Sequence, residues 1–292
     1  MNTEEKISQE FGGNKEYNDV FKTIKTIDTI SNKENKNWSI EDLENFLLSS
    51  FKKAGQKALK DNNGVIYTTL SGGLDSTLSL ALLRESLGSE VKIITFTMGG
   101  DKKHPDIKCG RLAAKEFKTE HHEFIPTPDE INIGLEDFKK ERPDENLEEA
   151  VSKGNFDVYL LYKYISSFEP KTVIVHDGID EQMGGYFLHR KEQLKEGERK
   201  ENFRSFWQKL KPEHLDGLIK SNRSRINFLF PYLDKKLVSF IAEIPVEDRV
   251  IKEIGKVPLR KIARKLGVPQ EIINRPKIGA IDMTVTFFSQ PL

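Results

Sequence analysis

The stretch VIYTTLSGGLDSTLSLALLRE, residues 65–85, decides the fold of this chain. It opens with an apolar run typical of a buried strand and closes with apolar residues at helical spacing. Ser71, Gly72 and Gly73 interrupt both patterns at the junction. Two adjacent glycines between a buried strand and a helix indicate that the backbone lies very close to another group there.

Similar apolar strands alternate with helical segments on either side of this stretch. The predicted strands are residues 64–70, 90–99, 119–126 and 171–178, and the predicted helices are residues 39–61, 75–88, 106–118 and 156–168. Nearly continuous apolar strands that alternate with helices predict a three-layer α/β fold, a parallel sheet with helices on both faces.

The two ends of the chain differ from this middle part. Residues 1–36 are polar and predict a loosely held, flexible N-terminal arm, whereas residues 37–292 form the predicted main domain. After about residue 190 the pattern becomes mostly helical, which predicts a helical C-terminal section packed against one end of the sheet.

Composition excludes several classes of protein. The 292 residues contain 46 Lys and Arg against 46 Asp and Glu, so whole-chain charge gives no reason to expect a nucleic-acid partner. The single cysteine, Cys109, excludes an internal disulfide and a cysteine-cluster zinc site, and we expect it to be a small buried apolar residue. No run predicts a signal peptide or a membrane span, so we expect a cytoplasmic protein without a membrane partner.

The glycine junction has the features of a phosphate-binding loop. It follows the carboxyl end of a strand, Ser71 and Ser76 add hydroxyl groups, and the next helix directs its free N–H groups to the same point. The Rossmann pattern G-x-G-x-x-G and the P-loop pattern G-x-x-x-x-G-K-[ST] are both absent. A plain strand-to-helix turn remains an alternative, but Asp75 beside bound phosphate would require a divalent cation between them.

A second loop carries clustered carboxylates. The stretch VHDGIDEQMGGY, residues 175–186, places Asp177, Asp180 and Glu181 after another apolar strand. Carboxylates this close repel one another unless a cation or a hydrogen-bond donor is present. An acidic loop that caps a helix is the simpler alternative, and half of a magnesium site is the functional one.

Four motifs together resemble a known family. SGGLDS resembles the pyrophosphate loop of the ATP pyrophosphatase superfamily, and residues 175–186 resemble the motif GEGADExxGGY of the asparagine synthetase family. FPYLDKKLVSFIAEIP, residues 230–245, and GKVPLRKIARKLGVPQEIINRPKIGA, residues 255–280, resemble two later motifs of that family. The resemblance covers roughly residues 40–282 and implies an adenine nucleotide alpha hydrolase-like fold.

The resemblance also implies a reaction and a site. The reaction would use ATP and Mg²⁺ to activate a carboxylate, aspartate by default, as an acyl-adenylate with release of pyrophosphate. Ammonia or another amine would then give the amide and AMP. The implied residues are Asp75 and Asp180 for Mg²⁺; Leu70, Ser71, Gly72, Gly73, Asp75, Ser76, Met98 and Gly178 for ATP; and Lys277, Asp177 and Glu181 for catalysis. Without the resemblance, Lys256, Arg260, Arg275 and Lys277 would be interpreted as surface cations.

The sequence departs from the family pattern at three places. His176 and Asp177 replace a glycine and a glutamate, and the family's Glu-x-Arg is missing before Pro231. These departures concern the acceptor substrate rather than ATP. Glutamine-using members begin with a glutaminase domain whose cysteine follows the initiator Met, whereas residue 2 here is Asn. We therefore expect nitrogen from ammonia, a separate glutaminase subunit or an amine of the substrate.

Two other functions remain open at this stage. A superfamily relative that adenylates a nucleic-acid base in tRNA is one, although the balanced charge disfavours it. A regulatory subunit that binds ATP without catalysis is the other, and the Asp177 replacement motivates it. The sequence leaves open whether the chain forms a homo-oligomer.

Overall fold

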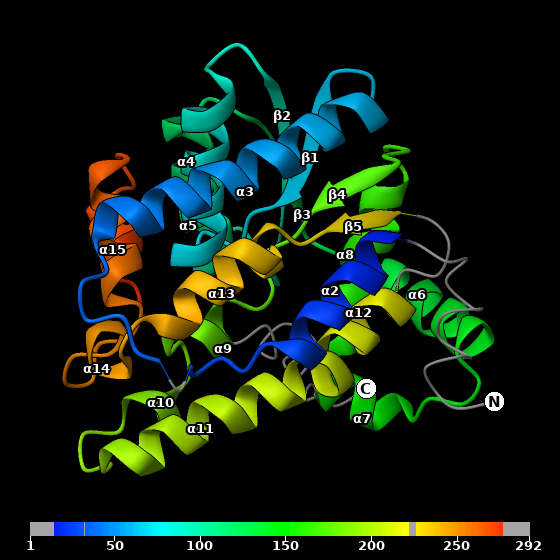
Figure 1. The fold of residues 1–292 in the computed structure, drawn as a ribbon. Helices are drawn as coiled ribbons and strands as arrows, with labels where there is room; N and C mark the ends of the chain where they lie inside the picture. The colour runs from blue at the N-terminus through cyan, green and yellow to red at the C-terminus, as the bar shows by residue number, and fades with distance from the viewer. Residues whose placement is uncertain (1–14, 32, 153, 222–225, 277–292) are drawn as a thin grey trace.

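The computed structural model describes residues 15–31, 33–152, 154–221 and 226–276, and one five-stranded sheet organises them (Figure 1). Every neighbouring pair of strands is parallel, in the order β3-β2-β1-β4-β5. The strands are β1 (Val65–Thr69), β2 (Lys92–Met98), β3 (Glu120–Phe124), β4 (Thr172–Ile174) and β5 (Asn227–Leu229). The predicted parallel sheet is confirmed, and β5 is an additional strand that the sequence did not predict.

Helices cover both faces of the sheet and extend beyond it at the C-terminal end (Figure 1). The first half contains α2 (Lys15–Thr26), α3 (Ile40–Asp61), α4 (Leu74–Leu87), α5 (Pro105–Glu116), α6 (Pro128–Glu141), α7 (Leu147–Ser152) and α8 (Asn155–Ser166). The second half contains α9 (Ile179–Met183), α10 (Phe187–Arg190), α11 (Glu196–Lys209), the π-helix η1 (Leu210–Leu215), α12 (Asp216–Ser221), the 3-10 helix η2 (Pro231–Leu233), α13 (Lys235–Glu243), α14 (Val246–Arg249), α15 (Val257–Lys265) and α16 (Gln270–Asn274).

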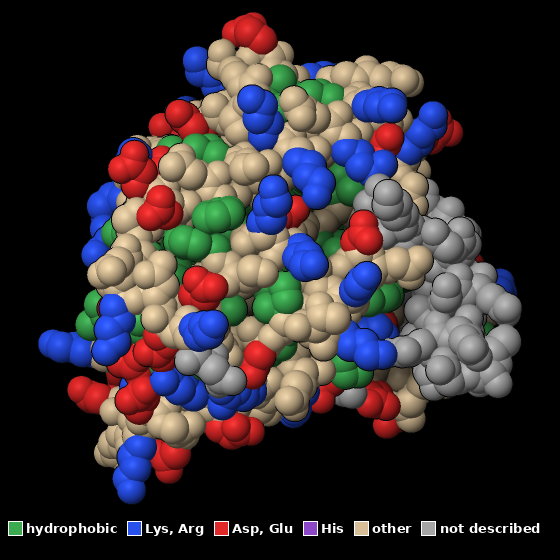
Figure 2. Space-filling view, in the orientation of Figure 1, with side chains coloured by type: hydrophobic (Ala, Val, Ile, Leu, Met, Phe, Trp, Pro, Cys, Tyr) green, Lys and Arg blue, Asp and Glu red, His purple; other side chains and the backbone are tan. Residues whose placement is uncertain are grey.

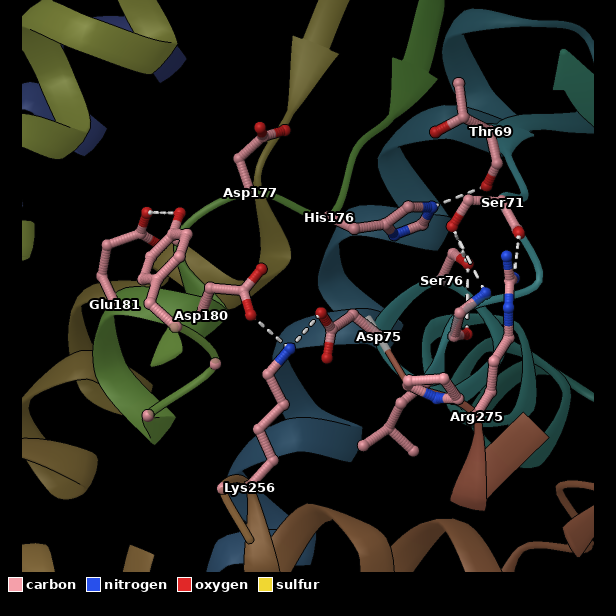
Figure 3. A pocket seen from close by; sticks show the side chains of 18 of the residues that line it. Thr69, Ser71, Asp75, Ser76, His176, Asp177, Asp180, Glu181, Lys256 and Arg275 are labelled. Atoms are coloured by element: carbon pink, nitrogen blue, oxygen red, sulfur yellow. Dashed lines mark hydrogen bonds and ion pairs between the residues drawn. The ribbon is translucent and has the colours of Figure 1, made fainter. Parts of the chain in front are cut away.

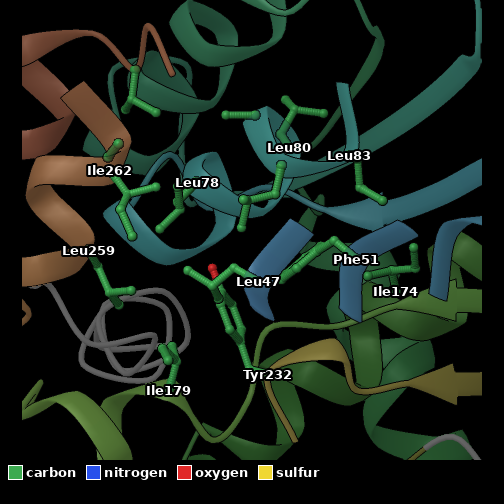
Figure 4. Close-up of a cluster of buried hydrophobic side chains, with 14 of the residues drawn as sticks. Leu47, Phe51, Leu78, Leu80, Leu83, Ile174, Ile179, Tyr232, Leu259 and Ile262 are labelled. Atoms are coloured by element: carbon green, nitrogen blue, oxygen red, sulfur yellow. The ribbon is translucent and has the colours of Figure 1, made fainter. Parts of the chain in front are cut away.

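Alternate residues of the strands point into two separate cores, because successive side chains of a strand face opposite ways. Ile66, Ile93 and Ile174 belong to the core that α3, α4 and the C-terminal helices complete, which Figure 4 shows around Leu47, Leu78 and Leu259. Their neighbours along the strands, such as Phe96 and Val173, belong to the core on the other face, together with residues of α2, α8 and α12. Burial on both faces explains why β1, β2 and β4 carry apolar side chains in both directions, whereas the edge strand β3 is mostly polar.

The segment before residue 37 packs on the domain over its described part. The hydroxyl of Tyr17 in α2 accepts a 3.0 Å hydrogen bond from the backbone N–H of Phe228 in β5, and Tyr17 and Val20 are both buried. The division of the chain at residues 36 and 37 stays a prediction.

Arg249 joins three segments that are distant in the sequence. Its guanidinium is completely buried and donates hydrogen bonds to the backbone carbonyls of Thr29, Gln182, Ala242 and Ile244. Burial lowers the pKa of Arg249 to about 9. The side chain therefore fixes the segment before residue 37 against α9, which carries two of the predicted site carboxylates.

The surface has no single-sign charge over the face shown in Figure 2, where Lys and Arg side chains are interspersed with Asp and Glu. No helix in the described parts of the chain is long and apolar enough to cross a membrane. Cys109 is buried in α5, as predicted.

Candidate active site

A cavity of about 960 Å³ opens where the strands end at their carboxyl side. Its wall includes Thr69 and Leu70 after β1, Met98 at the end of β2, and His176 and Asp177 after β4. Strand β1 leads outward through β2 to β3, whereas β4 leads the other way to β5. The cavity thus lies at the point where the strand order reverses, which is the usual ligand site of such sheets.

The glycine loop forms one wall of the cavity, as predicted. Gly73 is the N-cap of α4 and supplies no side-chain cap, so the first N–H groups of this 14-residue helix are not satisfied by a capping side chain. The hydroxyls of Ser71 and Ser76 lie 3.1 Å apart beside them (Figure 3). Uncapped N–H groups, a helix dipole and two hydroxyls together suit an anion such as phosphate.

Gly72 is required by the packing of the loop, and its place in the phosphate-binding loop stays a prediction. Its φ is +64°, and a Cβ there would lie 2.4 Å from the backbone of Cys109 and Gly110 in α5. The glycine is therefore required by the close packing of the loop against α5, as well as by the turn.

The acidic loop forms the opposite wall. Gly178, with φ +92°, caps the N-terminus of α9, which carries Asp180 and Glu181. Glu181 is 2% exposed, and the hydroxyl of Tyr186 donates a 2.6 Å hydrogen bond to its Oε1. Burial and then the charge of Glu181 raise the pKa of Tyr186, so this hydroxyl stays protonated.

The two predicted metal ligands meet at one cation, the ammonium group of Lys256. Nζ lies 2.5 Å from Oδ2 of Asp75 and 2.5 Å from Oδ1 of Asp180 (Figure 3). Burial alone would lower the pKa of Lys256, but the two carboxylates outweigh it and the pKa is raised. The two carboxylates therefore converge in the structure, and a lysine that was not predicted to be buried lies between them.

Two glycines make room for this arrangement. A Cβ on Gly185 would lie 1.5 Å from Oδ1 of Asp180, and a Cβ on Gly255 would lie 2.0 Å from the carbonyl oxygen of Gly184. Lys256 itself has a left-handed backbone, φ +58°, and donates its backbone N–H to the carbonyl of Met183 at 2.8 Å. The N-terminus of α15 is thereby fixed against the C-terminus of α9.

Asp75 and Asp180 fit a Mg²⁺ ion bound together with a nucleotide. Their oxygens converge on a single point, and hard oxygen ligands are those that Mg²⁺ prefers. The described residues contain no group of three or more His, Cys, Asp or Glu side chains that could hold a metal alone. One or two carboxylates completed by substrate phosphates is the usual Mg²⁺ arrangement in nucleotide enzymes.

Further cations line the cavity, and one of them lies beside the glycine loop. The guanidinium of Arg275 donates a 3.1 Å hydrogen bond to the carbonyl of Ser71 and pairs with Asp106. Arg190, Arg260, Lys261 and Arg264 also line the cavity. Arg260 and Arg275 were interpretable from the sequence only through the family motif, because isolated cations are usually solvated. Lys277 lies outside the described residues.

His176 borders the cavity between the two loops. Its Nε2 lies 2.7 Å from the carbonyl oxygen of Thr69, which can only accept, so Nε2 carries the proton and donates it. Its Nδ1 is buried and has no hydrogen-bond partner among the residues that the structure describes. Burial lowers the pKa of His176 to about 4, so the ring is neutral at physiological pH.

An apolar part of the wall was not predicted. The residues of this part are Val158, Leu161 and Tyr162 of α8 and Leu210 of η1, which line the cavity. Helical periodicity could predict that α8 is buried, but not that part of its buried face borders a cavity rather than the core. Leu70 and Met98, which were predicted to contact ATP, lie in the cavity wall.

These features define a nucleotide-type α/β site with paired carboxylates, and comparison with known proteins gives its family. The family model described as asparagine synthase matches residues 49–226 and 221–292. The chain belongs to the asparagine synthase family.

Curated relatives agree over most of this chain. The glutamine-hydrolyzing asparagine synthetase of Zea mays is 30% identical over 226 residues, which are 73% of this chain and 37% of that protein. The root asparagine synthetase of Pisum sativum is 30% identical over 232 residues, or 74% of this chain and 38% of that protein. The chain thus spans well under half the length of these relatives. Among solved structures, NMN synthetase from Francisella tularensis aligns with a TM-score of 0.47 and 13% identity over 84% of this chain and 78% of that chain.

Proposed function

We propose that this chain is an ATP-dependent ligase that forms an amide bond. A substrate carboxylate would attack the α-phosphorus of ATP, which gives an acyl-adenylate and releases pyrophosphate. Ammonia or another amine would then attack the acyl carbon and displace AMP. The observation that carries the proposal is the convergence of Asp75 and Asp180 beside the uncapped N-terminus of α4.

The phosphate-side residues have defined tasks in this reaction. The N–H groups at the start of α4 and the hydroxyls of Ser71 and Ser76 would hold the departing pyrophosphate. Asp75 and Asp180 would hold Mg²⁺, which offsets phosphate charge as the α-phosphorus is attacked. The adenine would lie against the backbone of Leu70 and Met98, because both residues border the same cavity.

The acceptor would lie between the acidic loop and the apolar wall. Asp177 and Glu181 face this part of the cavity and could orient an ammonium group of the substrate or of the nucleophile. Aspartate is the default acceptor because the family relatives are asparagine synthetases. The nitrogen would come from free ammonia or from a separate glutaminase. Lys277 is proposed to neutralise phosphate charge during the attack.

The test is a product analysis with purified protein, Mg-ATP, aspartate and ammonium. We expect AMP, pyrophosphate and asparagine in equal amounts by mass spectrometry. Exchange of labelled pyrophosphate into ATP that needs the carboxylate but not ammonium would identify the adenylate step. A panel of other carboxylates should follow if aspartate gives no exchange.

Two outcomes would contradict the proposal. Binding of ATP without AMP formation, whatever carboxylate is supplied, would indicate a regulatory subunit. AMP release that requires tRNA and not a small carboxylate would indicate a nucleic-acid substrate.

A further inference from the structure

Lys256 occupies the point where the two metal-binding aspartates meet. We propose that Lys256 competes with free Mg²⁺ for Asp75 and Asp180, so that the metal binds well only together with the nucleotide. This inference rests on the proposed function only in taking Mg-ATP as the ligand of the site. Lys256 is here a positioning residue and not a catalytic one.

The competition follows from geometry. Nζ lies 2.5 Å from one oxygen of each aspartate, whereas Mg²⁺ binds oxygen ligands at about 2.0–2.1 Å. A metal ion that used both oxygens would therefore take nearly the same point as Nζ. Two cations cannot share that point, so Lys256 has to leave before the metal binds both carboxylates.

The lysine is held at this point by its backbone. Lys256 begins α15 in a left-handed conformation, and its N–H is bonded to Met183 beside Asp180. Gly185 and Gly255 allow the chain segments to approach this closely. Because the backbone is fixed on both sides, release of the carboxylates is a movement of the side chain alone.

Charge explains why the nucleotide should matter. Two carboxylates and one ammonium together carry one net negative charge, which attracts free Mg²⁺ only weakly. The ammonium also repels the metal ion. Removing a buried ammonium from its carboxylates is costly unless it gains another anion. Nucleotide phosphates bring several negative charges beside the start of α4 and provide that anion. The nucleotide should therefore raise metal affinity, and the metal should raise nucleotide affinity by the same factor.

The first test uses the wild-type protein and Mn²⁺ as the probe. Mn²⁺ binding is measured by electron paramagnetic resonance, alone and with saturating α,β-methylene-ATP, which resists cleavage at the reacting bond. Mn²⁺ binding to the analogue without protein is measured separately and subtracted. We expect the protein–analogue complex to bind Mn²⁺ at least tenfold more tightly than the protein alone. Equal affinities would overturn the proposal without use of any variant.

The second test removes the lysine. Lys256→Met should bind Mn²⁺ at least tenfold more tightly than the wild type in the absence of nucleotide, and Asp180→Asn in that background should abolish the gain. Lys265→Met is the matched control, because Lys265 is on the same helix but pairs with Glu44 outside the cavity, 2.7 Å away. Unchanged or weaker Mn²⁺ binding by folded Lys256→Met would overturn the proposal. Lys256→Gln replaces it if the methionine variant does not fold.

The outcomes also separate this inference from the proposed function. Failure to form AMP with any carboxylate would contradict the function and leave the Mn²⁺ result valid. Normal AMP formation with no change in Mn²⁺ affinity for Lys256→Met would contradict the inference alone.

Discussion

The hydroxyl of Tyr186 donates a 2.6 Å hydrogen bond to the carboxylate of Glu181. Tyr186 is the N-cap of α10, and the carboxylate is buried on α9. Tyr186→Phe should lower the free energy of unfolding by about 1–3 kcal/mol, because the buried carboxylate loses a donor that water does not readily replace. Urea denaturation followed by circular dichroism measures this change.

Tyr67→Phe is the control for that substitution. Tyr67 stacks on Phe96 in the sheet, and no hydrogen bond of its hydroxyl is found within the described chain. We expect a loss below about 0.5 kcal/mol. Equal losses for the two variants would show that the Tyr186–Glu181 hydrogen bond does not contribute measurably to the free energy of unfolding.

Asp75→Asn should reduce AMP formation by roughly a hundredfold or more while the protein stays folded. The amide keeps the shape of the side chain but removes the charge that binds the cation, and loss of one electrostatic contact to a reacting phosphate costs about this factor. Steady-state AMP release at saturating ATP measures it. Exposed Asp129→Asn should keep full activity; near-normal turnover of Asp75→Asn would refute the metal assignment.

Gly185→Ala should disrupt the site through one methyl group. Its Cβ would lie 1.5 Å from Oδ1 of Asp180, so this carboxylate has to move away from Lys256. We expect at least a tenfold weaker binding of the ATP analogue and a loss of about 1–3 kcal/mol in stability. Isothermal titration calorimetry and urea denaturation measure the two effects.

Gly100→Ala is the matched control, because a Cβ on Gly100 would meet no atom within 4 Å. It should leave both quantities unchanged. Wild-type affinity in Gly185→Ala would mean that the position of Asp180 is not needed for nucleotide binding.

Lowering the pH should make the folded protein less stable, because of His176. The folded pKa is about 4, and the unfolded pKa is about 6.5, so only the unfolded chain binds this proton between those values. The free energy of unfolding therefore decreases as the pH falls from about 6.5 to 4, by about 3 kcal/mol in total. The unfolding free energy measured at several pH values should show this slope, which is proportional to the number of protons taken up on unfolding. His176→Asn should lower that number by one.

His214→Gln is the control for the pH experiment. His214 is an exposed histidine of the same cavity wall and gives a matched histidine substitution. A slope that persists in His176→Asn would assign the proton to another group.

The placement of Asp75 and Asp180 was predictable, because parallel strands deliver the loops at their carboxyl ends to one edge of the sheet. The fold was predictable for a related reason: β1, β2 and β4 carry apolar residues on both faces, which join two different cores. Strand β5 was not predicted, because its three residues, Asn227–Leu229, are too few to show an alternating pattern. The burial of Lys256 was also out of reach, since it depends on α15 docking against α9, more than 70 positions away in the sequence.

Arg249 sets a practical limit on how the chain can be shortened. Its buried guanidinium donates to the carbonyl of Thr29 at 2.9 Å and to that of Gln182, next to Glu181, at 3.0 Å. A truncated form that starts at residue 37 would leave part of the buried guanidinium without a hydrogen-bond acceptor. It would also loosen the helix that carries the acidic loop. Expression of the catalytic region in isolation should therefore keep α2 and the segment that follows it, and fusion partners should be attached ahead of that helix.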